Sequence, residues 1–196
     1  MRRILVGVSG ASGMPLAGTV LRELAGRGDV EVHCILSAAA RTVIAAECDE
    51  TPEELLACAH HVHDPEDLAA GPASGSWWHD RRCSGMLVVP CSMGTVGALA
   101  SGATRTLLHR AADVALKESF PLVLVVRESP LSEIHLRNLL RLRKAGAVVM
   151  PFSPGFYLRP KTLEDMLRQT CARILDQFGL EHDVRGWDAS PRTVTV

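Results

Sequence analysis

The chain lacks the features that mark nucleic-acid-binding and membrane proteins. Its net charge is −1, from 21 Lys and Arg against 22 Asp and Glu, so it has no basic excess to hold a phosphate backbone. No apolar run approaches the length that crosses a bilayer, and the short run at 4–8 leads straight into glycines, unlike a signal peptide. We therefore predict no nucleic-acid partner, no membrane span and a cytoplasmic location.

The six cysteines lack the pairing that a disulfide framework or a zinc ribbon needs. None forms a Cys-x-x-Cys pair, and several lie inside apolar runs, where a buried free thiol is the usual occupant. We predict free thiols, no disulfide and no bound metal.

The chain has too few residues for two comfortable domains but enough for one full core. We predict one domain over 1–196, with a C-terminal tail at 181–196. Short apolar runs rich in Val, Ile and Leu, typical of strands covered on both faces, occur at 4–8, 30–36, 86–90, 122–126 and 147–150.

Helical patterns separate these runs, clearest at 15–27 and 132–145, and Gly28 and Gly146 mark the predicted ends of these two helices. The alternation predicts a three-layer α/β fold with a doubly wound, mostly parallel sheet, flavodoxin-like or Rossmann-like. Residues 51–83 fit this pattern least, because Pro and Gly interrupt them, and we predict an excursion over the sheet edge. Trp77 and Trp78 in this segment are candidate packing or interface residues.

Ligands of such sheets bind beyond the carboxyl ends of the strands, so the residues after each predicted strand are candidates for function. The first strand leads into GVSGASG, which is neither G-x-G-x-x-G nor a Walker loop. A Gly/Ser turn entering a helix offers backbone N–H groups, the Ser12 hydroxyl and a helix dipole to a phosphate. The alternative is a tight turn in which glycine serves close packing alone.

The second and third predicted strands are also followed by small polar residues. Ser37 has the better explanation as a helix N-cap, and Glu47, at the negative end of the same helix, is a candidate for function. Ser92, Gly94 and Thr95 in PCSMGT can form a nest for an anion or a polar ring edge. Cys91 is either a nucleophile or a structural thiol, and we favour the thiol because no histidine stands at an activating spacing.

Charged and aromatic side chains follow the last two predicted strands. Arg127 and Glu128 end the fourth, where Arg127 is either a phosphate clamp or one partner of a loop ion pair. Tyr157 belongs to a Pro/Gly loop that either closes over a ligand or fills the core. Three further cations, Arg110, Lys117 and Arg173, lie on predicted helices, and spacing alone does not choose among them.

Taken in order, these stretches resemble the UbiX-type flavin prenyltransferases, formerly described as flavin-binding aromatic acid decarboxylases. The resemblance covers about residues 3–187, and no single motif carries it. Its parts are GVSGASG, Ser37, Glu47, PASGS, PCSMGT, RAADVALKE, PLVLVVRESPLS, IHLRNLL, PGFY and ARILDQFGL.

The resemblance implies an enzyme that joins a dimethylallyl group from dimethylallyl phosphate to N5 and C6 of reduced FMN without a metal. It further implies a homo-oligomer, commonly a dodecamer, with sites between subunits, and a UbiD-type decarboxylase that receives the prenylated FMN. Carried over by residue, the flavin contacts would be Gly10, Ala11, Ser12, Ser37, Ser92, Met93, Gly94, Thr95 and Arg127. The prenyl phosphate contacts would be Ser74, Arg110, Lys117, Arg127, Tyr157 and Arg173. The catalytic residues would be Ser12, Glu47, Lys117 and Glu128.

Two departures and two alternatives accompany this prediction. Ala38 stands where the family often has Lys, and the 77–84 segment is longer than usual. One alternative is an FMN-dependent cysteine decarboxylase of the same superfamily, although PCSMGT differs from the P-A-S-A-N-T of that group and we find no Met-Asn substrate clamp. The other is a non-catalytic flavin-binding subunit of a decarboxylase complex.

Overall fold

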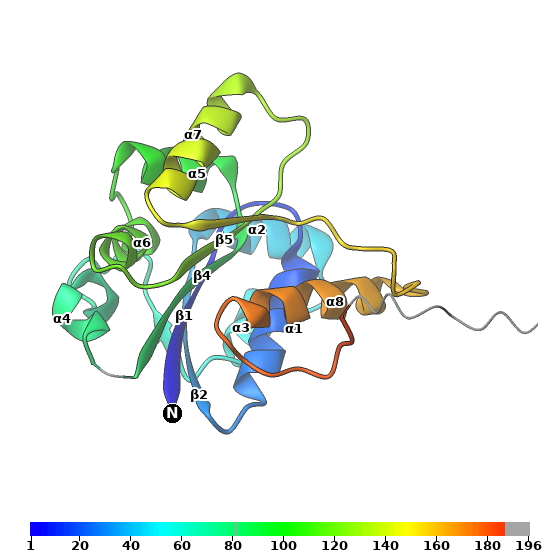
Figure 1. The fold of residues 1–196 in the computed structure, drawn as a ribbon. Coiled ribbons are helices and arrows are strands. Elements are labelled where there is room, and N and C mark those ends of the chain that lie inside the picture. Colours follow the sequence, from blue (N-terminus) through cyan, green and yellow to red (C-terminus); the bar gives the residue numbers. More distant parts are fainter. Residues whose placement is uncertain (81, 187–196) are drawn as a thin grey trace, which may run out of the picture. The chain divides into compact units, whose positions relative to one another are not determined.

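A computed structural model describes residues 1–80 and 82–186 of the protein (Figure 1). The described chain divides into two compact units, the first ending at Phe152 and the second beginning at Ser153. Arg81 in the long 77–84 segment and residues 187–196 of the predicted tail lie outside the described residues. The single domain over 1–196 stays a prediction.

The first unit is built on one six-stranded sheet of order β3-β2-β1-β4-β5-β6, in which every neighbouring pair is parallel. The strands are β1 (Arg2–Val8), β2 (Val30–Leu36), β3 (His61–His63), β4 (Cys83–Cys91), β5 (Leu122–Val126) and β6 (Val148–Pro151). All five predicted strands are therefore confirmed, within about two residues of their ends except at the start of β4.

Strand β3 was not predicted. It lies in the Pro- and Gly-interrupted segment and pairs with β2 at the edge of the sheet. It spans only three residues, His61–His63, and two of these are exposed. So short and exposed a strand has no apolar run for sequence reasoning to detect.

Helices cover both faces of the sheet. Those of the first unit are α1 (Met14–Ala25), α2 (Ala38–Glu47), α3 (Pro52–Leu56), α4 (Gly75–Trp78), α5 (Met93–Ser101), α6 (Leu107–Lys117) and α7 (Glu133–Lys144), with a 3₁₀ turn η1 (Gly71–Ala73). The second unit contains α8 (Leu163–Asp176). In Figure 1, α1 and α6 lie on opposite sides of the central strands, and both contact β4. The three-layer parallel α/β prediction is confirmed.

The core on the α6 side explains the local packing of the excursion. Leu5, Met86 and Val88 from the sheet pack with Leu108 and other residues of α5 and α6, and Trp78 joins the same cluster fully buried. The indole N–H of Trp78 donates to the Pro72 carbonyl oxygen at 2.9 Å. Trp78 is therefore a packing residue, which is one of the two roles, packing or interface, that the sequence suggested for it. None of the described helices has the length and apolar character that crossing a membrane requires.

Candidate functional site at the carboxyl edge of the sheet

The loops that follow β1, β2, β4 and β5 meet at one edge of the sheet. These loops begin side by side because the parallel strands end together: Val8 pairs with Leu36, and Cys91 pairs with Val126. The Ser37 N–H donates to the Val8 carbonyl oxygen at 3.0 Å. Residues that are far apart in the chain thus share one edge, as the strand pattern predicted.

Ser9 connects the loop after β1 to the loop after β4 through hydrogen bonds. Its side chain is buried, and its hydroxyl donates to the Pro90 carbonyl oxygen at 3.0 Å while accepting from the Ser92 N–H at 2.8 Å. Our sequence prediction did not include Ser9. The signal available was a hydroxyl immediately after a buried strand, but its partner, 83 residues away, is visible only in the structure.

Glycine at position 10 lets the first loop pack against the start of α2. A Cβ placed on Gly10 would lie 2.5 Å from the Ala39 Cβ, closer than such carbons approach, and 3.1 Å from the Ala39 carbonyl carbon. Gly13, the N-cap of α1, has a φ of 114°, a left-handed conformation that glycine adopts without strain. Close packing therefore explains Gly10, and backbone conformation explains Gly13, whatever else the loop binds.

The N-terminus of α1 is occupied by a carboxylate from another helix. Glu47 ends α2, and its Oε2 accepts from the Gly13 N–H at 2.8 Å and the Met14 N–H at 3.0 Å. The prediction left these two N–H groups free for a phosphate. In this structure they bind Glu47, because an anion is stabilised by the unpaired N–H groups and the positive end of a helix dipole.

Glu47 is held in its ionised form. Burial raises the pKa of its carboxyl group, but hydrogen bonds from Ser12, Met14 and Gly13 and the positive charge of Arg127 outweigh this, so the pKa lies below its ordinary value. Ser12 and Arg127 thus both act on the Glu47 carboxylate, Ser12 through a hydrogen bond and Arg127 through its charge. Sequence reasoning singled out all three residues without predicting these interactions.

Two further helices begin at this edge with serine caps. Ser37 Oγ accepts from the Ala40 N–H at 3.2 Å, which confirms the N-cap prediction. Ser92 Oγ accepts from the Thr95 N–H at 3.2 Å and donates to Thr95 Oγ1 at 3.1 Å, and Thr95 itself is buried. Each cap satisfies one N–H, which leaves the first N–H groups of α2 and α5 as donors at the edge.

Arg127 and Glu128, directly after β5, are both exposed at the same edge. The Glu128 Oε1 accepts from the Ser129 N–H at 3.0 Å, and this local contact does not involve Oε2. The edge therefore presents hydroxyls, backbone donors, one cation and two carboxylates. Such a set can bind a polar ring edge and a phosphate and move protons between them.

Three other predicted residues form a second group around η1, α4 and α6. Arg110 Nε donates to the Ala73 carbonyl oxygen at 3.1 Å, next to the exposed Ser74. A Cβ on Gly75 would lie 3.3 Å from Lys117 Nζ, so Lys117 reaches the same turn. The structure thus brings Ser74, Arg110 and Lys117 together.

The charges around Lys117 are partly balanced. Its ammonium group pairs with Glu118, whose other oxygen lies 2.8 Å from His79 Nε2. The hydrogen bonds from Lys117 and His79 hold the pKa of the Glu118 carboxyl group below its ordinary value. Sequence reasoning assigned no role to Glu118 or His79, although Glu118 directly follows Lys117.

Within one chain, Lys117 and Ser12 lie at opposite ends of the strands. Lys117 ends α6, which leads into the amino end of β5 at Leu122, whereas Ser12 follows the carboxyl end of β1. A parallel sheet keeps its amino and carboxyl ends apart. Lys117 and Ser12 therefore cannot contact one small ligand inside a single chain of this fold.

The second unit holds the last two predicted residues. Tyr157 and Arg173 line the same cavity of about 400 Å³, together with Asp176 and His182. Arg173 Nη1 donates to Asp176 Oδ2 at 2.6 Å, and its side chain is 63 % exposed. Arg173 is thus available at a surface, with a carboxylate that balances its charge.

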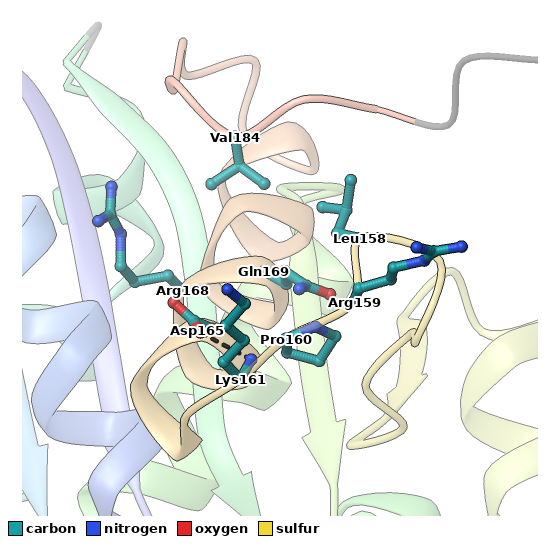
Figure 2. A pocket seen from close by; sticks show the side chains of 8 residues that line it. All are labelled: Leu158, Arg159, Pro160, Lys161, Asp165, Arg168, Gln169 and Val184. Atoms are coloured by element: carbon teal, nitrogen blue, oxygen red, sulfur yellow. Dashed lines mark hydrogen bonds between the residues drawn. The ribbon is translucent and has the colours of Figure 1, made fainter. Parts of the chain in front are cut away.

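A second cavity in this unit, of about 330 Å³, contains none of the predicted residues (Figure 2). It is lined by Leu158, Arg159, Pro160, Lys161, Asp165, Arg168, Gln169 and Val184. Figure 2 shows the side chains of Arg159 and Arg168 extending in opposite directions. Asp165 Oδ2 accepts from the Lys161 N–H at 2.9 Å, and Arg168 pairs with Asp183. Arg159 and Arg168 do not converge on one point, so these two side chains do not form a phosphate clamp.

Cys91 lacks the properties of a nucleophile. It is fully buried at the end of β4, and burial raises the pKa of its thiol far above the ordinary value. All six cysteines, which lie within the described residues, are free thiols. The interpretation of Cys91 as a structural thiol is supported.

Comparison with known proteins identifies close relatives. The Flavoprotein family model matches residues 1–174. The chain is 51% identical over 178 residues to the flavin prenyltransferase UbiX of Deinococcus radiodurans, covering 91% of this chain and 89% of that protein.

Two solved structures share the fold over nearly the whole chain. One is a dodecameric FMN-dependent UbiX-like decarboxylase from Escherichia coli O157:H7, with a TM-score of 0.91, 43% identity and coverage of 95% of this chain and 100% of that one. The other is AnUbiX in complex with FMN and dimethylallyl pyrophosphate, with a TM-score of 0.89, 45% identity and coverage of 95% and 99%.

Proposed function

The chain belongs to the flavin prenyltransferase family, and from this premise we propose that it joins a dimethylallyl group from dimethylallyl phosphate to N5 and C6 of reduced FMN. The observation that carries the proposal is the Glu47 carboxylate at the start of α1, bound by Ser12 and Gly13 and acted on by the charge of Arg127, on the edge where a doubly wound sheet binds its ligands. When bound, reduced FMN supplies the nucleophilic ring atoms, and the product is prenylated FMN.

The donors at the carboxyl edge fit a flavin mononucleotide. α2 and α5 both begin at this edge, Met93 and Gly94 stand at the start of α5, and Gly10 lies close to Ala39 of α2. Backbone N–H groups and hydroxyls suit both a phosphate and the carbonyl edge of an isoalloxazine ring. Gly10, Ala11, Ser12, Ser37, Ser92, Met93, Gly94, Thr95 and Arg127 remain our proposed flavin contacts.

Glu47 and Ser12 are placed to handle protons. Glu47 is ionised and already accepts a hydrogen bond from Ser12, so the pair can accept a proton and pass it along one hydrogen bond. Glu128, one residue beyond Arg127, is the second carboxylate of the proposed reaction centre. Both carboxylates lie at the helix and strand ends where a bound flavin ring would be exposed to them.

The cations hold the departing phosphate. Breaking the C–O bond of the donor places negative charge on phosphate, and fixed cations stabilise that charge without a metal. Ser74, Arg110, Lys117, Arg127, Tyr157 and Arg173 are the proposed contacts. Because Lys117 and Ser12 lie at opposite ends of the strands, one complete site takes Lys117 from a second copy of the chain.

A homo-oligomer therefore belongs to the proposal, and the dodecameric relative supports it. A UbiD-type decarboxylase is the proposed recipient of prenylated FMN. The Lys117 group of one copy would meet the Ser12 group of another, so the site forms only on assembly.

Phosphate release separates this function from its alternatives. Anaerobic protein should release inorganic phosphate from dimethylallyl phosphate only when reduced FMN is present, with one phosphate per flavin consumed. Loss of CO₂ from a C-terminal cysteinyl peptide, without phosphate release, would instead indicate a cysteine decarboxylase. Flavin binding with neither reaction would indicate a non-catalytic flavin carrier.

A further inference from the structure

The lateral edge of the sheet, where the outermost strand β3 pairs with β2, carries a cluster of histidines that the proposed function does not use. Glu31 and His33 alternate on β2, and His61 and His63 alternate on β3. Side chains two apart on a strand point to the same face, and His33 pairs directly with His61. All four side chains therefore gather on one face of the two strands.

Three ligand atoms of this cluster converge. His61 Nε2 lies 3.0 Å from Glu31 Oε1, and His33 Nε2 lies 3.7 Å from the same oxygen. One ligand atom from each of Glu31, His33 and His61 lies within 4.8 Å of the others. Ligands bound tetrahedrally to zinc at their usual bond lengths stand about 3.3 Å apart, so only a small adjustment is needed.

His33 supplies the second and independent observation. The residue is 6 % exposed, and its Nε2 is buried with no hydrogen-bond partner in the described part of the chain. A buried ring nitrogen without a partner costs free energy unless something binds it. This nitrogen faces Glu31, where the other two ligand atoms also meet.

The surrounding contacts orient the ligands as metal sites require. His33 Nδ1 lies 2.8 Å from His63 Nε2, which leaves His33 Nε2 for coordination, as second-shell partners do in metal sites. Glu31 uses its two oxygens differently. Oε1 faces the histidines, whereas Oε2 lies 3.6 Å from Arg3 Nε and 3.9 Å from Arg82 Nη1. The two arginines form ion pairs with Oε2, which leaves Oε1 to the histidines.

We propose that Glu31, His33 and His61 bind a divalent zinc-type metal ion that fastens the edge strand β3 to β2. Two imidazoles and a carboxylate are ligands that zinc accepts, and a fourth position is left for water because the His61 side chain is 53 % exposed. The ion would stabilise a strand of only three residues at an open edge. Our prediction of no metal rested on cysteine spacing, whereas this proposed site consists of residues that only strand pairing brings together.

Zinc titration of the full-length, untagged and metal-free protein tests this site. Calorimetry should show one Zn²⁺ bound per chain, and zinc should raise the melting temperature. His61→Ala should weaken binding at least about 10-fold and abolish the thermal shift. Because His61 is half exposed, this variant keeps the buried His33 in place. His79→Ala, which removes an exposed histidine outside the cluster, should bind zinc as the wild type does.

Cobalt provides a second readout that does not depend on stability. Co²⁺ bound through Glu31 and two histidines should give intense visible absorption, which Glu31→Gln weakens and added zinc removes. Absence of stoichiometric zinc binding in the wild type would overturn the proposal. Equal zinc affinity in the wild type, His61→Ala and Glu31→Gln would overturn it as well.

Discussion

Glu47, at the end of α2, accepts hydrogen bonds from the start of α1. Replacing it with glutamine tests the role of its charge while keeping its shape. Glu47→Gln keeps an oxygen that can accept from the Gly13 and Met14 N–H groups but removes the negative charge and the proton acceptor. We expect kcat for prenyl transfer to fall about 100-fold, with FMN affinity changed by less than about 3-fold. Steady-state kinetics and flavin titration measure the two effects, and a kcat within about 3-fold of wild type would exclude Glu47 from proton transfer.

The same residue gives a pH dependence of defined sign. The folded-state pKa of Glu47 is lowered from 4.5, so the ionised carboxylate stabilises the fold above that pH. This contribution is lost as the pH falls through the folded pKa. The stability difference between wild type and Glu47→Gln in urea should therefore shrink on acidification from about pH 6 to below the folded pKa. A difference that grew on acidification would show that the sign is wrong.

Cys91 has two possible roles, nucleophile or structural thiol, and its chemical reactivity can distinguish them. Burial raises the pKa of Cys34 to about 12 and that of Cys91 further, whereas Cys58 is only half buried. At about pH 8, iodoacetamide should modify Cys58 and spare Cys34 and Cys91. Cys91→Ala should keep prenyl transfer and lose about 1 kcal/mol of stability. An inactive but folded Cys91→Ala would restore the nucleophile hypothesis.

At the scale of elements, the first loop requires glycine at position 10 because its backbone packs closely against α2. Gly10→Ala would place a Cβ 2.5 Å from the Ala39 Cβ, so the loop and α2 must move apart. We expect a loss of about 1–3 kcal/mol and weaker FMN binding. Gly28→Ala is the matched control, since its Cβ would meet nothing within 4 Å, and it should leave both properties unchanged or add slight stability. Equal effects of the two substitutions would contradict this account of the loop.

The elements also show what sequence can and cannot predict. Buried parallel strands are recognisable in a sequence as apolar runs, so β1, β2, β4, β5 and β6 were predicted. β3 was missed because three partly exposed residues carry no such pattern. Ser37 was predicted as a cap because capping is local. The Glu47 contact with Gly13 spans 34 residues, and the histidine cluster needs two paired strands, so neither follows from local pattern.

At the scale of the molecule, the positions of Lys117 and Ser12 at opposite ends of the strands predict a site shared between copies. Lys117→Ala and Glu47→Gln should each have strongly reduced activity as pure oligomers. Subunit exchange between the two variants should restore activity to about one quarter of wild type, because one pairing in four contains both native side chains. Mixed oligomers whose activity stays strongly reduced would show that both residues act within one chain.

The phosphate contacts make a prediction about binding. Lys117→Ala and Arg173→Ala should raise the KM for dimethylallyl phosphate far more than the dissociation constant for FMN, because both cations are assigned to the prenyl phosphate. Flavin fluorescence titration measures the second quantity. Comparable weakening of both ligands would show that these two cations are assigned to the wrong group.

The mass of the flavin after one anaerobic turnover tests the central claim most directly. Purified protein, reduced FMN and dimethylallyl phosphate should yield a flavin heavier by one prenyl unit, with the new bonds at N5 and C6 located by NMR of the isolated product. Recovery of unmodified FMN from a folded, flavin-binding oligomer would contradict the proposal that this chain is a flavin prenyltransferase.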